Sequence, residues 1–278
     1  MSLTPFQARY GRAVNEPAIE ASELIARQLQ RTSKRKFNSK SLPEGMLELL
    51  LASAQSSPSS GLLQTWSVLA LTTEEDKLKL LSDEYMSKVV WSKDSSNFMA
   101  IKTCPLLLIW LADLSKLDVI LQNKECDQII KEQVDIAEYH LKAVIDATIA
   151  AQTFYMSAES MGLHGTYLGA IRQLPIDRLT ALFNLPEYTF PIFGMAIGYS
   201  DEVSRIKPRL PAELVLYKSA YKKMESIDQL GEYEDHHKTL VHNNESITFS
   251  ERVVERLSPA RSKSWIGDNL KKMGFTFK

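Results

Sequence analysis

AVIDATIAAQTFYMSAESM, residues 143–161, is the part of this sequence that constrains its architecture most strongly. Its residues favour a helix, and alanine or larger apolar side chains would occur on nearly every side of it. A helix that is apolar all round has to be buried on all sides, either in the centre of a core or at an interface between subunits. We expect this segment to be the second half of a long helix over residues 127–161.

Around this helix the chain alternates irregularly between helical and strand-like patterns. Few strands among many helices, without regular strand–helix alternation, favour an α+β fold over a doubly wound sheet. Helices are expected over 16–30, over 41–55 with Ser41 as the cap, within 73–103 and over 175–184; strands are expected at 66–72, 105–113, 162–171 and 190–202. Residues 1–278 are interpreted as a single domain, in which 208–278 form a polar, charged C-terminal extension.

Composition excludes several classes of protein. Thirty-three basic and thirty-four acidic residues give a net charge of -1, so no overall field attracts nucleic acid or an anionic membrane. The longest strongly apolar run, 105–112, is too short to span a bilayer, and no signal-like segment opens the sequence. Two cysteines, Cys104 and Cys126, do not form a disulfide framework. We expect a cytoplasmic protein.

Three stretches contain residues suited to binding a ligand. RTSKRKF (31–37) offers cations and hydroxyls that could hold a phosphate, or it is a solvated basic loop. SSPSSGLLQTW (56–66) combines small residues with Gln64, which suits the edge of a flat heterocycle, or it is an ordinary connection. KPRLP (207–211) holds two cations on a stiff backbone, which could equally form surface ion pairs.

Other motifs are weaker. DHH (235–237), with His242 nearby, lacks the spacing of a metal site, and the serines of residues 56–60 lack a nucleophile-elbow context. No glycine-rich dinucleotide fingerprint and no Walker loop occurs. The sequence therefore predicts neither a metal centre nor a side-chain nucleophile.

Taken together and in this order, the motifs resemble the FMN-dependent nitroreductase family. RTSKRKF stands where the family has H-R-S-x-R-x-F, and SSGLLQTW follows after the next helix. TYLGAIR (166–172) follows the long helix, and KPRLP matches the family letter for letter. The order is most similar to the branch of NADPH-linked major nitroreductases and flavin reductases.

The resemblance implies a nitroreductase-like fold, a small and mostly antiparallel sheet wrapped by helices. It also implies an intertwined homodimer with FMN at the subunit interface. In that arrangement the all-round apolar helix builds the dimer core, and the extension 208–278 packs on the partner subunit.

Site residues are implied position by position. The resemblance places no catalytic side chain and no metal, because the flavin carries the hydride transfer. Arg172 is implied as a contact to the nicotinamide substrate. The implied cofactor-binding residues are Arg31, Thr32, Ser33, Lys34, Arg35, Ser59, Gln64, Ser87, Tyr167, Leu168, Gly169, Ala170, Lys207 and Arg209.

The sequence departs from the family pattern at several of these positions. Arg31 replaces the usual histidine and Thr32 the usual arginine, while Lys34 adds a charge. Where the branch has arginines for the 2′-phosphate of NADPH, this chain reads TLVHNNES, with Leu240 and Glu245. The donor, NADPH or NADH, is therefore left open.

The implied activity is hydride transfer from NAD(P)H through FMN to a nitroaromatic, a quinone or a flavin, by a ping-pong mechanism. A second hypothesis is a non-catalytic flavin carrier or sensor, which the missing arginines motivate. A third is a nucleic-acid module that uses RTSKRK, which the neutral net charge disfavours. The expected partners are small-molecule acceptors and a second copy of this chain, with no nucleic acid and no membrane.

Overall fold

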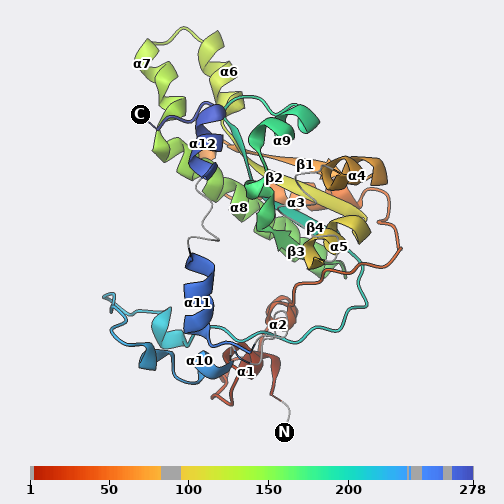
Figure 1. Cartoon of the computed structure of the whole chain (residues 1–278), viewed down its shortest axis with the longest axis vertical. Helices are drawn as coiled ribbons and strands as arrows, with labels where there is room; N and C mark the ends of the chain where they lie inside the picture. The colour runs from red at the N-terminus through yellow and green to blue at the C-terminus, as the bar shows by residue number, and fades with distance from the viewer. Residues whose placement is uncertain (1–2, 83–94, 237, 239–245, 259–264, 278) are drawn as a thin grey trace. The chain divides into compact units, whose positions relative to one another are not determined.

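The computed structural model describes residues 3–82, 95–236, 238, 246–258 and 265–277. The chain divides into two compact units (Figure 1). The sheet unit comprises Ser33–Val203 and Ser264–Lys278, and the second unit comprises Met1–Thr32 and Ser204–Lys263.

A four-stranded antiparallel sheet is the centre of the described part of the sheet unit. Its strands lie side by side in the order β1 (Trp66–Leu71), β2 (Leu106–Asp113), β4 (Thr189–Gly198) and β3 (His164–Leu168). Helices surround this sheet (Figure 1). The predicted α+β class, with a small antiparallel sheet wrapped by helices, is confirmed.

β2 lies at the middle of the hydrophobic core. All 8 of its residues are buried, as its continuous apolar run predicts for a strand covered on both faces. The register with β4 shifts between Trp110 and Leu111, opposite Phe193 and Pro191. Because proline has no N–H to donate, the irregularity falls where the ladder of hydrogen bonds is already interrupted.

The long helix is shorter than predicted. In place of one helix over 127–161, α7 (Gln128–Lys131) and the 3-10 turn η3 (Glu132–Asp135) precede α8 (Ala137–Ser160). Ile136 has extended backbone angles, φ -78° and ψ 146°, so the helical hydrogen bonds cannot run through it. The prediction was wrong at the start of this segment and correct for its second half.

One side of α8 is buried and another is exposed. Ala143, Ala147 and Ala150 are completely buried, and small side chains here let the helix approach the sheet closely. Leu141 and Ile145, one turn apart, are 54% and 46% exposed. Burial on all sides is therefore not achieved within one chain.

Two predicted helices begin later than expected. α2 (Glu23–Gln30) starts after Ser22, whose hydroxyl accepts a hydrogen bond from the N–H of Ile25, so the segment 16–22 is not helical. α3 (Met46–Gln55) starts after Gly45, which has the left-handed φ of 77° and ends the preceding turn. Ser41 is therefore not the cap of α3.

Of the remaining helices of the sheet unit, α6 (Ser115–Asn123) projects away from the sheet beside α7, and the others lie nearer the strands (Figure 1). The polar region 73–103 is helical where it is described, and the strand at 162–171 ends in a 3-10 turn after Leu168. These elements are α4 (Glu74–Ser82), α5 (Ser96–Thr103), α6, η1 (Ser60–Leu62), η4 (Gly169–Gln173) and α9 (Ile176–Phe183).

In the second unit, Arg9 connects the N-terminal segment with residues 29–31 and with residue 209. The guanidinium of Arg9 donates to the carbonyls of Leu29, at 2.9 Å, and of Arg31. The N–H of Arg209 donates to the carbonyl of Arg9, at 2.7 Å. Its helical elements are α1 (Pro5–Tyr10), α2, η5 (Ala212–Leu214), η6 (Ile227–Leu230), α10 (Glu232–His236) and α11 (Phe249–Leu257).

The end of the chain packs on the core of the sheet unit. After α12 (Trp265–Lys272), Phe275 is fully buried, and its ring lies 5.8 Å from that of Tyr188. The N–H of Thr276 donates to the carboxylate of Asp135 at 2.5 Å. Phe275 and Thr276 thus contact their own chain, while packing of the extension 208–278 on a partner subunit stays a prediction.

Candidate functional site

The predicted cofactor-binding residues are distributed over both units. Arg31, Thr32, Lys207 and Arg209 belong to the second unit, and Ser87 lies outside the described residues. The other members belong to the sheet unit: Ser33, Lys34, Arg35, Ser59, Gln64, Tyr167, Leu168, Gly169 and Ala170, together with the predicted substrate contact Arg172.

The basic segment SKRKFN (33–38) is fixed by its main chain between β3 and the end of β4. The N–H of Lys34 donates to the carbonyl of Gly165 at 3.0 Å. The N–H of Arg35 donates to the carboxylate of Glu202 at 2.8 Å. Two backbone donors are therefore already used, and a carboxylate stands beside a segment that is predicted to bind an anion.

The two cations of this segment have different surroundings. The ammonium of Lys34 donates to the carbonyl of Glu202, so it already has a partner. The Nε of Arg35 is buried and has no hydrogen-bond partner. Burial, and secondarily the nearby charge of Lys34, lowers the pKa of His164 from its ordinary value.

The loop SSPSSGLLQT (56–65) is fixed by a buried carboxylate. The hydroxyl of Ser59 donates to Asp146 of α8 at 2.6 Å, and the hydroxyl of Thr65 donates to the same oxygen at 3.0 Å. The N–H of Ser60 donates to the other oxygen at 3.1 Å. The small hydroxyls at this junction therefore bind the loop to α8.

Gln64 lies in an unusual backbone conformation within this loop. Its φ is 53° and that of Leu62 is 57°, in the left-handed region that side chains larger than glycine rarely occupy. The N–H of Gln64 donates to the hydroxyl of Ser59 at 2.7 Å, while its side chain is exposed. Its carboxamide is thus accessible to a ligand.

Tyr167 on β3 is held from both sides. Its ring centroid lies 5.5 Å from that of Tyr155 and 5.0 Å from that of Phe193. Its hydroxyl donates to the carboxamide of Gln152 on α8 at 3.0 Å. α8 therefore anchors both the loop 56–65 and the strand that leads to the predicted flavin-facing backbone.

The backbone after Tyr167 turns at Leu168, where β3 ends and η4 begins with Gly169 and Ala170. A side chain at Gly169 would come within 3.4 Å of the guanidinium of Arg172. That guanidinium donates to the carbonyl of Ile192 on β4. Arg172 thus lies folded against this turn and uses one of its donors within the protein.

In the second unit the motif KPRLP lies against α1. The guanidinium of Arg209 donates to the carbonyls of Lys207, at 2.9 Å, and Pro208, at 3.0 Å. Arg9 connects this motif with Arg31 through the two contacts described above. The structure therefore brings two of the predicted phosphate-binding segments, 31–32 and 207–209, onto the same helix.

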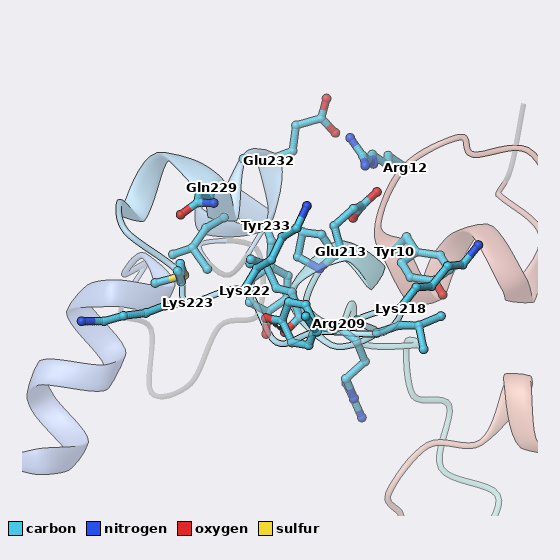
Figure 2. Close-up of a pocket in the computed structure, with 18 residues that line it drawn as sticks. Tyr10, Arg12, Arg209, Glu213, Lys218, Lys222, Lys223, Gln229, Glu232 and Tyr233 are labelled. Carbon is cyan, nitrogen blue, oxygen red and sulfur yellow. Dashed lines mark hydrogen bonds between the residues drawn. The ribbon is translucent and has the colours of Figure 1, made fainter.

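A cavity of about 650 Å³ lies in the second unit (Figure 2). Of the predicted site residues in the described part of the chain, Arg209 lines it. The other charged lining residues are Arg12, Lys218, Lys222 and Lys223, with Glu213 and Glu232. In Figure 2 these side chains fan out in different directions, so the cations do not converge on one point.

Two residues that fix the site were not predicted. Asp146 holds the loop and Glu202 holds the basic segment, across sequence separations of 87 and 167 residues for their contacts with Ser59 and Arg35. Asp146 was visible as a carboxylate in an otherwise apolar helical stretch, which is costly to bury without partners. Glu202 carried no comparable signal in the sequence.

Within the described residues, no three His, Cys, Asp or Glu side chains lie together as a metal site would require. Nor does any helix in the described ranges have the length and apolar character needed to cross a bilayer.

Comparison with known proteins extends over nearly the whole chain. A Cr(VI) reductase of Pseudomonas sp. (strain G-1) is 30% identical over 251 residues, which are 89% of this chain and 96% of that protein. An FMN reductase (NADPH) of Bacillus subtilis (strain 168) is 26% identical over 255 residues, 89% of this chain and 96% of that protein. The solved structure of B. megaterium NfrA1 has a TM-score of 0.80 at 25% identity, and covers 92% of this chain and 100% of its own.

Family models match the chain in two parts. Residues 29–199 match the nitroreductase family, and residues 207–278 match the C-terminal domain of the same family. The first match includes the sheet, the basic segment, the loop 56–65 and α8. The resemblance expected from the sequence is confirmed, and this chain belongs to the nitroreductase family.

Proposed function

We propose that this chain is an FMN-dependent oxidoreductase that takes electrons from NADPH or NADH. As acceptors we propose a nitroaromatic, a quinone or a flavin. The acceptor would bind after the oxidised donor has left, at the same site, in a ping-pong mechanism. Membership of the nitroreductase family and the names of the reductase relatives support this function. The observation in the sheet unit that carries it is the buried, unpartnered Nε of Arg35, next to a backbone fixed on both sides.

The residues of the chain fit FMN. An arginine whose buried donor lacks a partner is suited to a phosphate or to the polar edge of the ring. Arg31 and Arg209 of the second unit are proposed to add charge for the phosphate. The exposed carboxamide of Gln64 and the backbone of residues 168–170 are proposed to meet the ring.

FMN, when bound, would supply the hydride and electron chemistry, so the protein needs no nucleophile or acid–base pair of its own. The chain's residues would bind and orient the reactants. Tyr167, packed between two other rings and bonded to Gln152, keeps the turn at residues 168–170 in place. Arg35 would hold negative charge that develops on the ring edge.

We further propose a homodimer whose core includes α8. Leu141, Ile145 and Ile149 form a row at successive turns of α8 and are 54%, 46% and 37% exposed in the single chain. A partner subunit would bury them. Ile145→Asp should therefore shift the protein from dimer to monomer in sedimentation velocity, whereas Glu138→Gln, on the same helix, should not.

A cytoplasmic location is proposed on chemical grounds. Cys104 and Cys126 are both free thiols, and Cys104 is buried. Free thiols persist in a reducing compartment.

The test of the enzyme is an anaerobic mixing experiment. The purified protein is reconstituted with FMN and mixed with NADPH or NADH, and the flavin band near roughly 450 nm is followed. Rapid bleaching by either donor is the expected result, and the ratio of the two rates identifies the preferred donor. A bound flavin that neither donor bleaches would contradict the proposal and favour a non-catalytic flavin carrier.

A further inference from the structure

Asp146 is the most completely buried carboxylate that contacts the predicted site segments. It is 1% exposed and lies on α8 among alanines. Its two oxygens accept three hydrogen bonds, from the hydroxyls of Ser59 and Thr65 and from the N–H of Ser60. A carboxylate is stable in such a place only when donors replace the water it has lost.

Asp146 reaches Gln64 through one intermediate residue. The hydroxyl of Ser59 donates to Asp146 at 2.6 Å and accepts from the N–H of Gln64 at 2.7 Å. An acceptor that is itself donating to an ionised group is polarised, which strengthens the second bond. Gln64 occupies a left-handed φ of 53°, a conformation that persists when surrounding contacts impose it.

Neighbouring contacts attach the same part of the chain to α8 but do not lead to Gln64. The hydroxyl of Ser57 donates to Thr153 at 2.8 Å, and a hydrogen bond of 2.6 Å joins Ser53 to Ser157. These bonds hold the end of α3 and the beginning of the loop. Ser53 and Ser57 therefore help to fix the loop without a connection to Gln64, whereas Asp146 contacts the loop and is also connected to Gln64 through Ser59.

We infer that Asp146 is a positioning residue that acts through Ser59 to set the backbone of Gln64 for binding the flavin ring. This inference rests on the proposed FMN site. Asp146 does not itself touch the ligand, since its oxygens are occupied by the loop. Ser59 then transmits this constraint, and Gln64 is the residue that meets the heterocycle.

The first experiment uses the protein without FMN, so that it does not depend on the proposed function. Hydrogen exchange of the Gln64 amide is compared in the wild type, Asp146→Asn, Ser59→Ala and Ser57→Ala. Exchange should be faster by about tenfold or more in the first two variants, which lose the bond or its polarisation. It should be unchanged in Ser57→Ala, the matched control. Equal exchange in all four proteins would overturn the inference.

The second experiment measures FMN affinity. Asp146→Asn and Ser59→Ala should each raise the Kd for FMN by about tenfold, and Ser57→Ala should leave it within about twofold. In a Gln64→Asn background, which keeps a residue tolerant of positive φ but shortens the side chain, Asp146→Asn should add little. An undiminished effect in that background would show that Asp146 does not act through Gln64.

The two proposals fail in different ways. A wild-type protein that does not bind FMN contradicts the proposed function, while the exchange experiment still reports on the relay. A wild type that binds FMN, with Asp146→Asn and Ser59→Ala binding equally well, contradicts the inference alone. If Asp146→Asn does not fold, Ser59→Ala, which removes one small hydroxyl, gives the answer.

Discussion

The loop 56–65 and the basic segment 33–38 are both predicted to contact the same ligand. The loop is held mainly by its side chains, and the basic segment is held mainly by its main chain. In the loop, side-chain hydroxyls bind Asp146 on α8. In the basic segment, main-chain N–H groups bind a carbonyl of β3 and the carboxylate of Glu202. The side chains of the basic segment therefore contribute less to its shape.

This difference predicts which substitutions the two segments tolerate. A segment held by its main chain can exchange side chains without losing its course, so its cations are free to vary with the ligand. A loop held by its side chains depends on residue identity. Lys34, one of the departures from the pattern that the resemblance implies, lies in the basic segment, whereas SSGLLQ in the loop follows that implied pattern.

The largest effect is expected from removing the anchor of the loop. Asp146→Ala leaves three donors without their acceptor in a buried place and should lower the free energy of unfolding by about 3 kcal/mol. Urea unfolding at pH 7 measures this. Glu138→Ala, an exposed carboxylate on the same helix, should change it by less than about 0.5 kcal/mol. Similar losses in the two variants would show that Asp146 is not a special anchor of the loop.

A smaller loss is expected from removing the anchor of the basic segment. Glu202→Ala should lower the free energy of unfolding by about 1 kcal/mol, because Glu202 is only half-buried and water can replace its oxygen for the N–H groups of Arg35 and Lys36. The same urea experiment gives the value. A loss as large as that of Asp146→Ala would show that both segments depend equally on a side-chain anchor.

Substitution of Arg35 is expected to change the affinity for FMN but not the stability of the fold. Arg35→Met should leave the free energy of unfolding within about 0.5 kcal/mol of the wild type, since the backbone keeps its bonds, but raise the Kd for FMN about tenfold. Fluorescence titration of FMN measures the Kd. Lys36→Met, at the exposed neighbouring position, is the matched control and should change neither quantity appreciably. Weaker binding in both variants would indicate general attraction by charge and no specific contact.

The smallest effect concerns His164, beside the basic segment. Its pKa lies below the ordinary value of about 6.5, mainly through burial and secondarily through the charge of Lys34. The unfolded chain therefore binds the proton more tightly than the folded chain does. Folding stability associated with the neutral His164 ring is fully present above about pH 6.5 and is lost as the pH falls below that value. Lys34→Met should raise the pKa of His164 without restoring its ordinary value.

An NMR titration of the His164 ring in wild type and Lys34→Met checks this directly. Full return of the pKa to its ordinary value would mean that the charge, and not burial, is the larger cause. An unchanged pKa would mean that Lys34 has no electrical influence on the strand it adjoins.

The strands were predictable because their signals are local. The apolar run of β2 and its burial agree nearly residue for residue, since a covered strand needs apolar side chains at every position. Helix ends were less predictable. Ser41 was expected to cap α3, but the residue that precedes this helix is Gly45. Its left-handed backbone ends the preceding turn, so the helix begins there without a side-chain cap.

The candidate site was predictable only in its residue types. Serines, Gln64 and the basic run were all identified, but their partners Asp146 and Glu202 are far away in the sequence. No local pattern states which serine donates to which carboxylate. Pairing of this kind is settled by packing of the whole sheet unit, and a single sequence gives no access to it.

The burial of Phe275 has a consequence for how the protein is made. Its ring is completely enclosed and lies 4.6 Å from that of His140 on α8, so the core around α8 includes a residue from near the end of the sequence. On a ribosome, the sheet unit therefore cannot complete its core until Phe275 has emerged. Until then the core around α8 lacks one of its buried rings, and apolar surface that Phe275 later covers is exposed to association with other chains.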